Sequence, residues 1–285
     1  MNTSLTVPPI GELQAPPSWR TVDFISDLHL NADEPATFSA WQHYLQATPA
    51  DAVFILGDLF EVWAGDDVIN VDSIQDSADP AHSTHSAGNF ENRCACTLRQ
   101  ASSRLALFFM HGNRDFLAGQ ALMAFCRASL LDDPTVLGFA GERWLLSHGD
   151  ALCLDDRDYM QFRRQVRSSA WQDAFLAKPL AERQVIAREL RRQSEARKNV
   201  VTDYADVDAS AARQWLAAAN ARTLIHGHTH KPAVHDLGDG FSRVVLSDWD
   251  AHAEPPRADV LRLTAGGLQR LPLVSAGALS PKATS

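Results

Sequence analysis

The chain has 285 residues, which is enough for one sizeable domain with an inserted subdomain. Hydrophobic residues make up 45% and the net charge is −9, which argues against a general nucleic-acid binder because such proteins are broadly basic. The four cysteines lack the spacing of a disulfide framework and therefore indicate a reducing compartment. No apolar run approaches the roughly 18 residues that a membrane span needs, and prolines break up residues 1–20, so we expect neither a span nor a signal peptide.

Five short apolar runs along the chain share one feature, because each ends abruptly in polar residues that can bind metal ions. The runs are residues 22–25, 52–56, 105–110, 144–146 and 223–225. Runs this short, bounded by turn residues, predict buried strands. Helix-length stretches at 38–46 and 118–127 predict βαβ crossovers and a mainly parallel core. Ligands bind beyond the carboxyl ends of such strands, so we expect the five ends to converge on one edge.

Four other segments complete the predicted domain organisation. Residues 1–20 form a flexible extension, 70–97 a polar surface loop, 155–219 a helical insert and 271–285 a flexible tail. The insert has helical periodicity, and from Arg157 to Lys198 it holds 11 basic and 5 acidic residues, a net charge of +6. This basic island is interpreted either as a solvated helix face or as a surface for an anionic substrate or lipid. A further strand is predicted near residues 258–264, before the tail.

The polar residues at the strand ends form a pattern that points to metal chemistry. Asp27 and His29, and again His228 and His230, stand two residues apart, so each pair projects from one side of an extended segment. Carboxylate, imidazole and amide ligands without thiolate suit Mn²⁺, Fe²⁺, Mg²⁺ or Zn²⁺ at a catalytic site. The candidate ligands number seven, too many for one ion with an open position, and so indicate two ions that share a carboxylate. They are Asp27, His29, Asp58, Asn113, His148, His228 and His230.

In its order of motifs the chain resembles the calcineurin-like metallophosphoesterases. The motifs are Asp-x-His, Gly-Asp, Gly-Asn-Arg-Asp, His-Gly-Asp and Gly-His-x-His, and the likeness covers about residues 21–270. This resemblance implies an α/β fold, a β-sandwich flanked by helices, with residues 155–219 as a helical cap. It also implies that one metal ion is held by Asp27, His29, Asp58 and His230. The second is then held by Asp58, Asn113, His148 and His228, with Asp58 bridging.

Longer stretches resemble one group of the family, the UDP-2,3-diacylglucosamine pyrophosphatases of lipid A biosynthesis. They are residues 57–67, 111–116, 148–156 and 225–235. The resemblance implies hydrolysis of UDP-2,3-diacylglucosamine to UMP and 2,3-diacylglucosamine 1-phosphate. It also implies two Mn²⁺ ions and a cytoplasmic protein held peripherally at the inner membrane, with no obligate protein partner.

The same resemblance suggests which residues act on the substrate. Asp58, Asn113 and Arg114 are the expected catalytic residues. Many relatives have His where this chain has Arg114, and a guanidinium suits a phosphate leaving group, which needs charge stabilisation more than a proton. The expected substrate contacts are Asn113, Arg114, Asp156, Ser194, Lys198 and His228.

The apolar residues of the insert leave two interpretations open. Trp171, Phe175, Leu176, Leu180, Val185 and Ile186 line a chamber for acyl chains or form the core of the insert itself. Two alternative functions also remain at this point. One is a soluble metallophosphoesterase acting on nucleotides or phosphoproteins, and the other is a non-catalytic scaffold, which would have no need of seven intact ligands.

Overall fold

Two six-stranded sheets form the body of the protein. The computed structural model describes residues 7–69, 89–198 and 206–273, without the side chains of 194–198. One sheet has the strand order β12-β11-β2-β3-β4-β5. Its strands are β2 (Thr21–Ile25), β3 (Ala52–Leu56), β4 (Ala106–Met110), β5 (Ala128–Leu131), β11 (Asp259–Thr264) and β12 (Gly267–Pro272). The other sheet has the order β1-β6-β7-β8-β10-β9. Its strands are β1 (Gly11–Gln14), β6 (Thr135–Phe139), β7 (Glu142–Leu146), β8 (Thr223–His226), β9 (Val234–Gly238) and β10 (Phe241–Val245).

The core lies between the two sheets and on their outer faces. Strand β3 shows how the alternation of side chains works, because Phe54 packs between the sheets while Val53 and Ile55 point to the outer helices. The layer between the sheets includes a stacked pair of rings, Phe54 and Phe108, whose centroids are 4.6 Å apart. Both faces of the central strands are therefore buried, which explains why they are continuous apolar runs in the sequence.

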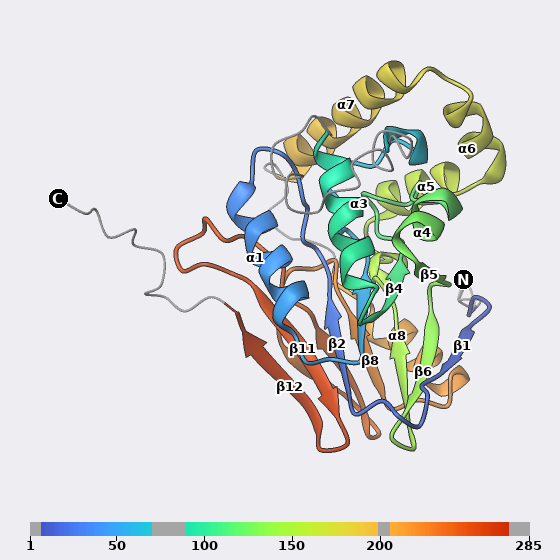
Figure 1. Cartoon of the computed structure of the whole chain (residues 1–285). Helices are drawn as coiled ribbons and strands as arrows, with labels where there is room; N and C mark the ends of the chain where they lie inside the picture. Colours follow the sequence, from blue (N-terminus) through green and yellow to red (C-terminus); the bar gives the residue numbers. More distant parts are fainter. Residues whose placement is uncertain (1–6, 70–88, 199–205, 274–285) are drawn as a thin grey trace.

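Helices cover both outer faces of the sandwich (Figure 1). The face of the first sheet packs against α1 (Pro35–Ala47), α3 (Phe90–Ala101) and α4 (Gln120–Cys126). The face of the second sheet packs against α8 (Ala209–Ala218), which buries Trp215 and Leu216 against Leu145 and Leu224. The result is a sandwich of two sheets between two helical layers.

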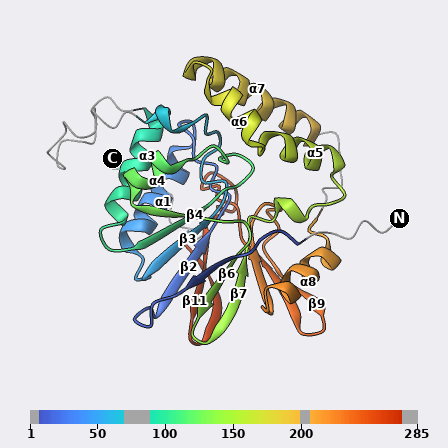
Figure 2. The same cartoon turned by 90° about the vertical axis from the view of Figure 1, so that its right-hand side faces the viewer.

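Three helices form a cap beside the ends of the strands (Figure 2). They are α5 (Arg157–Val166), α6 (Ser169–Leu176) and α7 (Leu180–Lys198). Ser168 caps the start of α6 by accepting a hydrogen bond from the Trp171 backbone N–H, and Phe175 in α6 is buried in the outer core of the first sheet.

The five predicted strands that precede polar motifs are all present, and residues 259–264 form the further strand expected there. The prediction of one mainly parallel sheet from periodicity is wrong. The α/β sandwich implied by the family resemblance is correct, because β2, β3 and β4 lie in one sheet while β7 and β8 lie in the other.

The expected segment boundaries differ from the structure in four places. Residues 11–14 form β1, which pairs with β6, so the flexible extension over 1–20 is wrong for this part. Residues 90–97 belong to α3, so the polar loop over 70–97 is wrong there, and 70–88 lie outside the described residues. Helix α8 packs on the sandwich, so the cap insert ends before residue 219. Of the tail expected from 271 to 285, residues 271–272 belong to β12, and 274–285 lie outside the described residues.

Candidate metal-binding active site

Both sheets contribute side chains to one cluster beyond their carboxyl edges. Asp27, Asp58 and Asn113 follow β2, β3 and β4 of the first sheet, while His148 and His228 follow β7 and β8 of the second. Backbone hydrogen bonds join these loops, because the Gly227 N–H donates to the His148 carbonyl and the Asp27 N–H donates to the Gly57 carbonyl. Residues 201 positions apart in the chain are thus held in contact.

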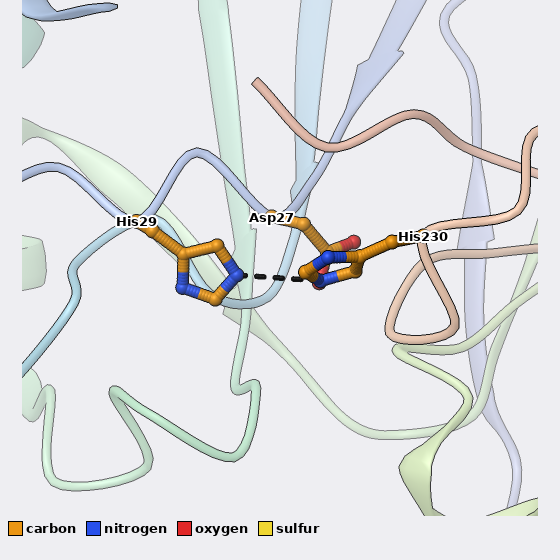
Figure 3. A group of neighbouring side chains, drawn as sticks. All are labelled: Asp27, His29 and His230. Carbon is orange, nitrogen blue, oxygen red and sulfur yellow. Dashed lines mark hydrogen bonds and ion pairs between the residues drawn. The ribbon is translucent and has the colours of Figure 1, made fainter. Parts of the chain in front are cut away.

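A first group of ligand atoms comes from Asp27, His29 and His230, shown in Figure 3. The Nε2 atom of His230 lies 3.2 Å from Asp27 Oδ1 and 3.4 Å from His29 Nε2. Two imidazoles and a buried carboxylate that point to one spot are a typical transition-metal donor set.

A second group comes from Asn113, His148 and His228. Asn113 Oδ1 lies 3.1 Å from His148 Nε2 and 2.9 Å from His228 Nδ1. The Nδ1 of His148 donates to the Leu56 carbonyl at 2.9 Å, and this bond leaves Nε2 as the atom with the lone pair. Hydrogen bonding alone favours the opposite orientation of the Asn113 amide, in which its oxygen lies 3.2 Å from Arg114 Nε. A cation beside the two imidazoles would favour the orientation in which the oxygen faces the imidazoles.

Asp58 lies between the two groups. Its Oδ2 atom is 3.9 Å from His29 Nε2, and its Oδ1 atom is 3.8 Å from His148 Nε2. Asp27, Asp58 and His148 also offer ligand atoms within 4.8 Å of one another. One carboxylate therefore faces both groups with different oxygens.

The backbone at these positions adopts the left-handed region that side chains with a Cβ rarely occupy. The φ angles of Asp27, His29, Asp58, His228 and His230 lie between 48° and 67°. Of the nine non-glycine residues with positive φ among the described residues, these five are candidate ligands. Such strain persists only where the surrounding structure enforces it, and it concentrates at functional sites.

The glycines of the motifs allow the loops to approach one another. A Cβ on Gly112 would overlap the Asp58 carboxylate, and a Cβ on Gly227 would overlap that of Asp27. Each glycine therefore admits the ligand that comes from a neighbouring strand.

Electrostatics at the cluster favour a cation. Burial raises the pKa of the Asp27 carboxyl, but the imidazoles around it, first that of His230, lower the pKa well below its usual value. Burial lowers the pKa of His148, but Asp58 and Asp27 raise it to about 9. Burial and the neighbouring His148 lower the pKa of His228 to about 3. The two carboxylates that stabilise a proton on His148 would equally stabilise a divalent ion in its place.

The donor set fits divalent metal ions. The groups consist of buried or half-buried carboxylate, imidazole and amide atoms, and thiolate is missing from both of them. Two groups sharing a carboxylate match the arrangement of two-metal hydrolytic sites.

Aspartates in two of the motifs, which the sequence analysis did not assign to the site, hold the loops together. Asp115 accepts hydrogen bonds from the backbone N–H groups of Leu59 at 2.7 Å and Gly112 at 2.8 Å. Asp150 is buried and accepts hydrogen bonds from the Tyr159 hydroxyl and from Arg163 Nε of α5. The Tyr159 ring also stacks on His228, with the centroids 5.9 Å apart. The sequence could have indicated these two aspartates, because each is the last residue of a motif that contains a candidate ligand.

The expected substrate-contacting residues have different positions. Arg114 lies beside the cluster, with its Nε atom 4.0 Å from Asp58 Oδ2. Asp156 is exposed and caps α5 by accepting a hydrogen bond from the Tyr159 backbone N–H, so the role that the structure shows for it is structural. Ser194 and Lys198 belong to α7, but their side chains lie outside the described part of the chain.

A cleft of about 680 Å³ opens at the first group of ligand atoms. Its lining includes His29, Glu61, Arg114, Arg188, Arg191 and His230. Arginines from the core and from the cap helix α7 therefore line the same cleft as two candidate ligands.

Comparisons with known proteins agree with this geometry. The model of the calcineurin-like phosphoesterases matches residues 20–232. A UDP-2,3-diacylglucosamine hydrolase of Chromobacterium violaceum is 45% identical over 88% of this chain and 98% of its own length. Proteins of the same name from Aromatoleum aromaticum and Ralstonia nicotianae are 44% and 42% identical, over 82% and 89% of this chain and 90% and 93% of their own lengths. The chain belongs to the calcineurin-like phosphoesterases and, within them, to the family of the UDP-2,3-diacylglucosamine hydrolases. Both the metallophosphoesterase fold and the closer likeness expected from the motifs are thereby confirmed.

Proposed function

We propose that this protein hydrolyses the diphosphate bond of UDP-2,3-diacylglucosamine to UMP and 2,3-diacylglucosamine 1-phosphate, using two divalent metal ions. The position of Asp58 carries the proposal, because its two oxygens face imidazoles of two separate groups at 3.9 and 3.8 Å. The names of relatives that match most of the chain supply the substrate.

In this proposal the two groups of ligand atoms form the two metal sites. Asp27, His29, Asp58 and His230 hold one ion, and Asp58, Asn113, His148 and His228 hold the other. The oxygen and imidazole donors suit Mn²⁺, which we propose as the native ion. When bound, such ions polarise a phosphoryl oxygen and lower the pKa of water, so that a hydroxide nucleophile forms at neutral pH.

The protein's own groups position the diphosphate and stabilise its charge. Water oxygen adds to phosphorus as the bond from that phosphorus to the bridging oxygen breaks, and the phosphate that leaves takes the electron pair. Arg114 is placed beside Asp58, where its guanidinium can pair with the phosphoryl oxygens as negative charge develops. The Asn113 amide lies next to both imidazoles of the second group and next to Arg114, so it connects those candidate ligands with the arginine.

The decisive test is incubation of the purified protein with UDP-2,3-diacylglucosamine, with ³¹P NMR to follow the products. We expect UMP and the lipid 1-phosphate to form with Mn²⁺, no turnover with EDTA, and recovery when Mn²⁺ is added back. Asp58→Asn should lose most activity, because the neutral amide removes the negative charge and one of the two oxygens that face the two groups. Efficient hydrolysis of unacylated UDP-glucosamine with no preference for the acylated compound would instead favour the soluble nucleotide hydrolase. Full turnover in excess chelator would exclude the metal mechanism.

We further propose that the cap touches the cytoplasmic face of the inner membrane, where the acylated substrate resides. Its helices α6 and α7 present Leu176 and Val185, whose side chains are 43% and 60% exposed, beside the basic residues of α7. Exposed apolar groups flanked by cations suit an anionic lipid surface. No helix in the described ranges is long and apolar enough to cross a membrane.

Co-sedimentation with vesicles containing phosphatidylglycerol tests this surface. We expect binding that weakens with salt and weakens further in the Leu176→Asp/Val185→Asp variant. A variant that sediments with the vesicles as well as the wild type would exclude the cap as the membrane contact.

A further inference from the structure

Glu61 connects a candidate metal ligand to the cap. It lies in the loop after β3, three residues beyond Asp58, and lines the cleft beside His29. Its Oε2 atom is 3.1 Å from Nδ1 of His29, within hydrogen-bond distance but away from a linear N–H···O angle. Both side chains are about one-fifth exposed, so solvent competes only partly for this contact.

This contact acts on the ring nitrogen that faces away from the ligand cluster. Nε2 of His29 points toward His230, at 3.4 Å, and toward Asp58, at 3.9 Å. A carboxylate at Nδ1 keeps the proton on that nitrogen, so the lone pair of Nε2 is directed at the cluster. At His148 the hydrogen bond from Nδ1 to the Leu56 carbonyl likewise leaves the lone pair on Nε2. Glu61 contacts His29 at the nitrogen opposite to the one that faces His230 and Asp58, so its position is that of a support rather than a ligand.

The cap supplies the second contact of Glu61. Its Oε1 atom accepts a hydrogen bond from Nε of Arg191, which projects from α7. Arg191 therefore holds one oxygen of the carboxylate while the other oxygen contacts His29. Helix α7 thus contacts Glu61, the residue that supports the candidate ligand His29, in addition to lining the cleft.

A second arginine of α7 attaches the helix to the same loop after β3. Arg183 is 2% exposed and donates to the Ala64 carbonyl and to the Asp67 carboxylate. It also donates to the Lys178 carbonyl at 2.9 Å, which ties the start of α7 to the preceding turn. Ala64 and Asp67 follow Glu61 within six residues. Arg183 and Arg191 of the same helix therefore both bind the short segment from Glu61 to Asp67.

We propose that Glu61 is a positioning residue that aims His29 at the metal, and that Arg191 places Glu61, so that docking of the cap helix strengthens metal binding at the site of His29. This inference rests on the proposed function in one respect, since it takes His29 to be a metal ligand.

Direct Mn²⁺ binding tests it without reference to turnover. The free ion gives an EPR signal that is lost on binding, so a titration of the full chain reports stoichiometry and affinity. We expect two ions in the wild type and the loss of one site in His29→Ala. In Glu61→Ala the affinity of one site should fall by about 10- to 100-fold, as is typical when a residue that orients a metal ligand is removed, and the other site should be unchanged. Glu61→Gln keeps an oxygen that accepts from Nδ1–H, so it should recover most of the loss.

Matched controls separate positioning from charge and from folding. Glu91→Gln removes an acid from the wall of the same cleft and should bind Mn²⁺ like the wild type. Arg191→Ala should weaken the same site as Glu61→Ala. Arg192→Ala, which loses only an exposed ion pair with Glu189 on the helix surface, should not. Melting temperatures in EDTA show whether each variant is folded.

Three outcomes would overturn these statements separately. Wild-type affinity in Glu61→Ala, together with a lost site in His29→Ala, would refute the positioning role of Glu61. Equal affinities in Arg191→Ala and Arg192→Ala would refute the contribution of the cap. Absence of Mn²⁺ binding in the wild type, or two intact sites in His29→Ala, would refute the metal assignment of the proposed function instead.

Discussion

Arg114 is the residue for which position and chemistry agree most directly. Its backbone N–H donates to Asp58 Oδ1 at 2.8 Å, while its guanidinium lies beside Oδ2 of the same carboxylate. The backbone thus supports the proposed bridging ligand, and the side chain remains beside the place where a phosphoryl group would sit. A substitution that keeps the backbone separates these two contributions.

Arg114→Ala should retain both metal ions and lose about 10²- to 10³-fold in kcat, as for removal of one preorganised donor. Arg114→Lys should recover only part of this loss, because an ammonium group cannot reproduce the bidentate guanidinium contact. Steady-state kinetics and Mn²⁺ stoichiometry measure the two effects. Loss of metal from Arg114→Ala would show that the side chain acts on the metal site instead.

His226 is a buried histidine that the motif Gly-His-x-His does not include. Its Nδ1 donates to the Gly227 carbonyl at 2.9 Å, and its Nε2 accepts from Arg243, which is held by Asp206. Burial and the Arg243 charge lower the pKa of His226 from 6.5 to about 4. The folded protein therefore keeps this ring neutral at pH values where the unfolded chain protonates it.

The consequence is a loss of stability as the pH falls. Between pH 6.5 and 4 the unfolded state binds more protons at this residue than the folded state, so the free energy of unfolding decreases with decreasing pH. From pH 7 to pH 5 this residue should cost about 2 kcal/mol, on the basis of about 1.4 kcal/mol per pKa unit. Denaturant titrations in EDTA at the two pH values give the change, and His226→Gln should reduce it. Equal pH dependence in the two proteins would contradict the assignment.

At the scale of elements, the cap is attached to the sandwich through the loops that carry the ligands. Helix α5 is attached through Asp150, and α7 through Glu61 and Asp67. Four of the six apolar residues singled out in the cap sequence are buried or half-buried. Trp171, Phe175, Leu180 and Ile186 pack on the outer core of the first sheet, and only Leu176 and Val185 are exposed. The first four therefore belong to a core that the cap shares with the first sheet, rather than to a core of the insert alone.

Because Leu176 and Val185 are the exposed members of this set, they are the residues to change in a test of substrate recognition by the cap. Leu176→Asp and Val185→Asp should lower kcat/KM for UDP-2,3-diacylglucosamine, because contact with acyl chains is worth about 25 cal/mol per Å² of apolar area. The same variants should hydrolyse bis-p-nitrophenyl phosphate like the wild type, since a small diester needs only the metal cluster. Ala174→Asp places the same charge at an exposed position of α6 and serves as the control. A ratio of the two kcat/KM values that stays constant across these variants would mean that the exposed residues do not contact lipid.

At the scale of the whole molecule, the proposed metal ions join the two sheets. Asp27, Asp58 and Asn113 belong to loops of one sheet, and His148 and His228 belong to loops of the other. Binding to the folded state alone stabilises it, and each ion at 100 times its Kd contributes about 2.7 kcal/mol. Mutual repulsion of the buried Asp27 and Asp58 carboxylates is relieved at the same time.

Mn²⁺ should therefore raise the melting temperature of the protein by on the order of 5 °C or more. Differential scanning calorimetry with EDTA and with increasing Mn²⁺ provides the measurement. Asp58→Asn should melt near the wild-type temperature in EDTA but gain less from Mn²⁺. A melting temperature that does not depend on Mn²⁺ would show that the ions do not connect the sheets.

Local sequence was sufficient for the five strands that precede polar motifs and for the residues that follow them. A strand buried on both faces must be a short apolar run, as in residues 52–56, and the chain must become polar where it leaves the core. The candidate ligands could be found in this way because they stand directly at those boundaries. Their order along the chain was specific enough to indicate the family and, through longer stretches, its substrate.

Tertiary structure alone decided how these pieces meet. Whether β7 and β8 extend the sheet of β2 and β3 or form a second sheet depends on which apolar faces pack together, and periodicity does not carry that information. The same is true of β1, which is stabilised by pairing with β6 about 124 residues away rather than by its own composition. The contacts of Glu61 with His29 and Arg191 join side chains 32 and 130 positions apart, and those of Asp150 with α5 depend on the orientation of the cap. Side chains that act through such long-range contacts are positioned by folding of the entire chain. For this reason the sequence indicated the candidate ligands but not Glu61, Arg191 or Asp150.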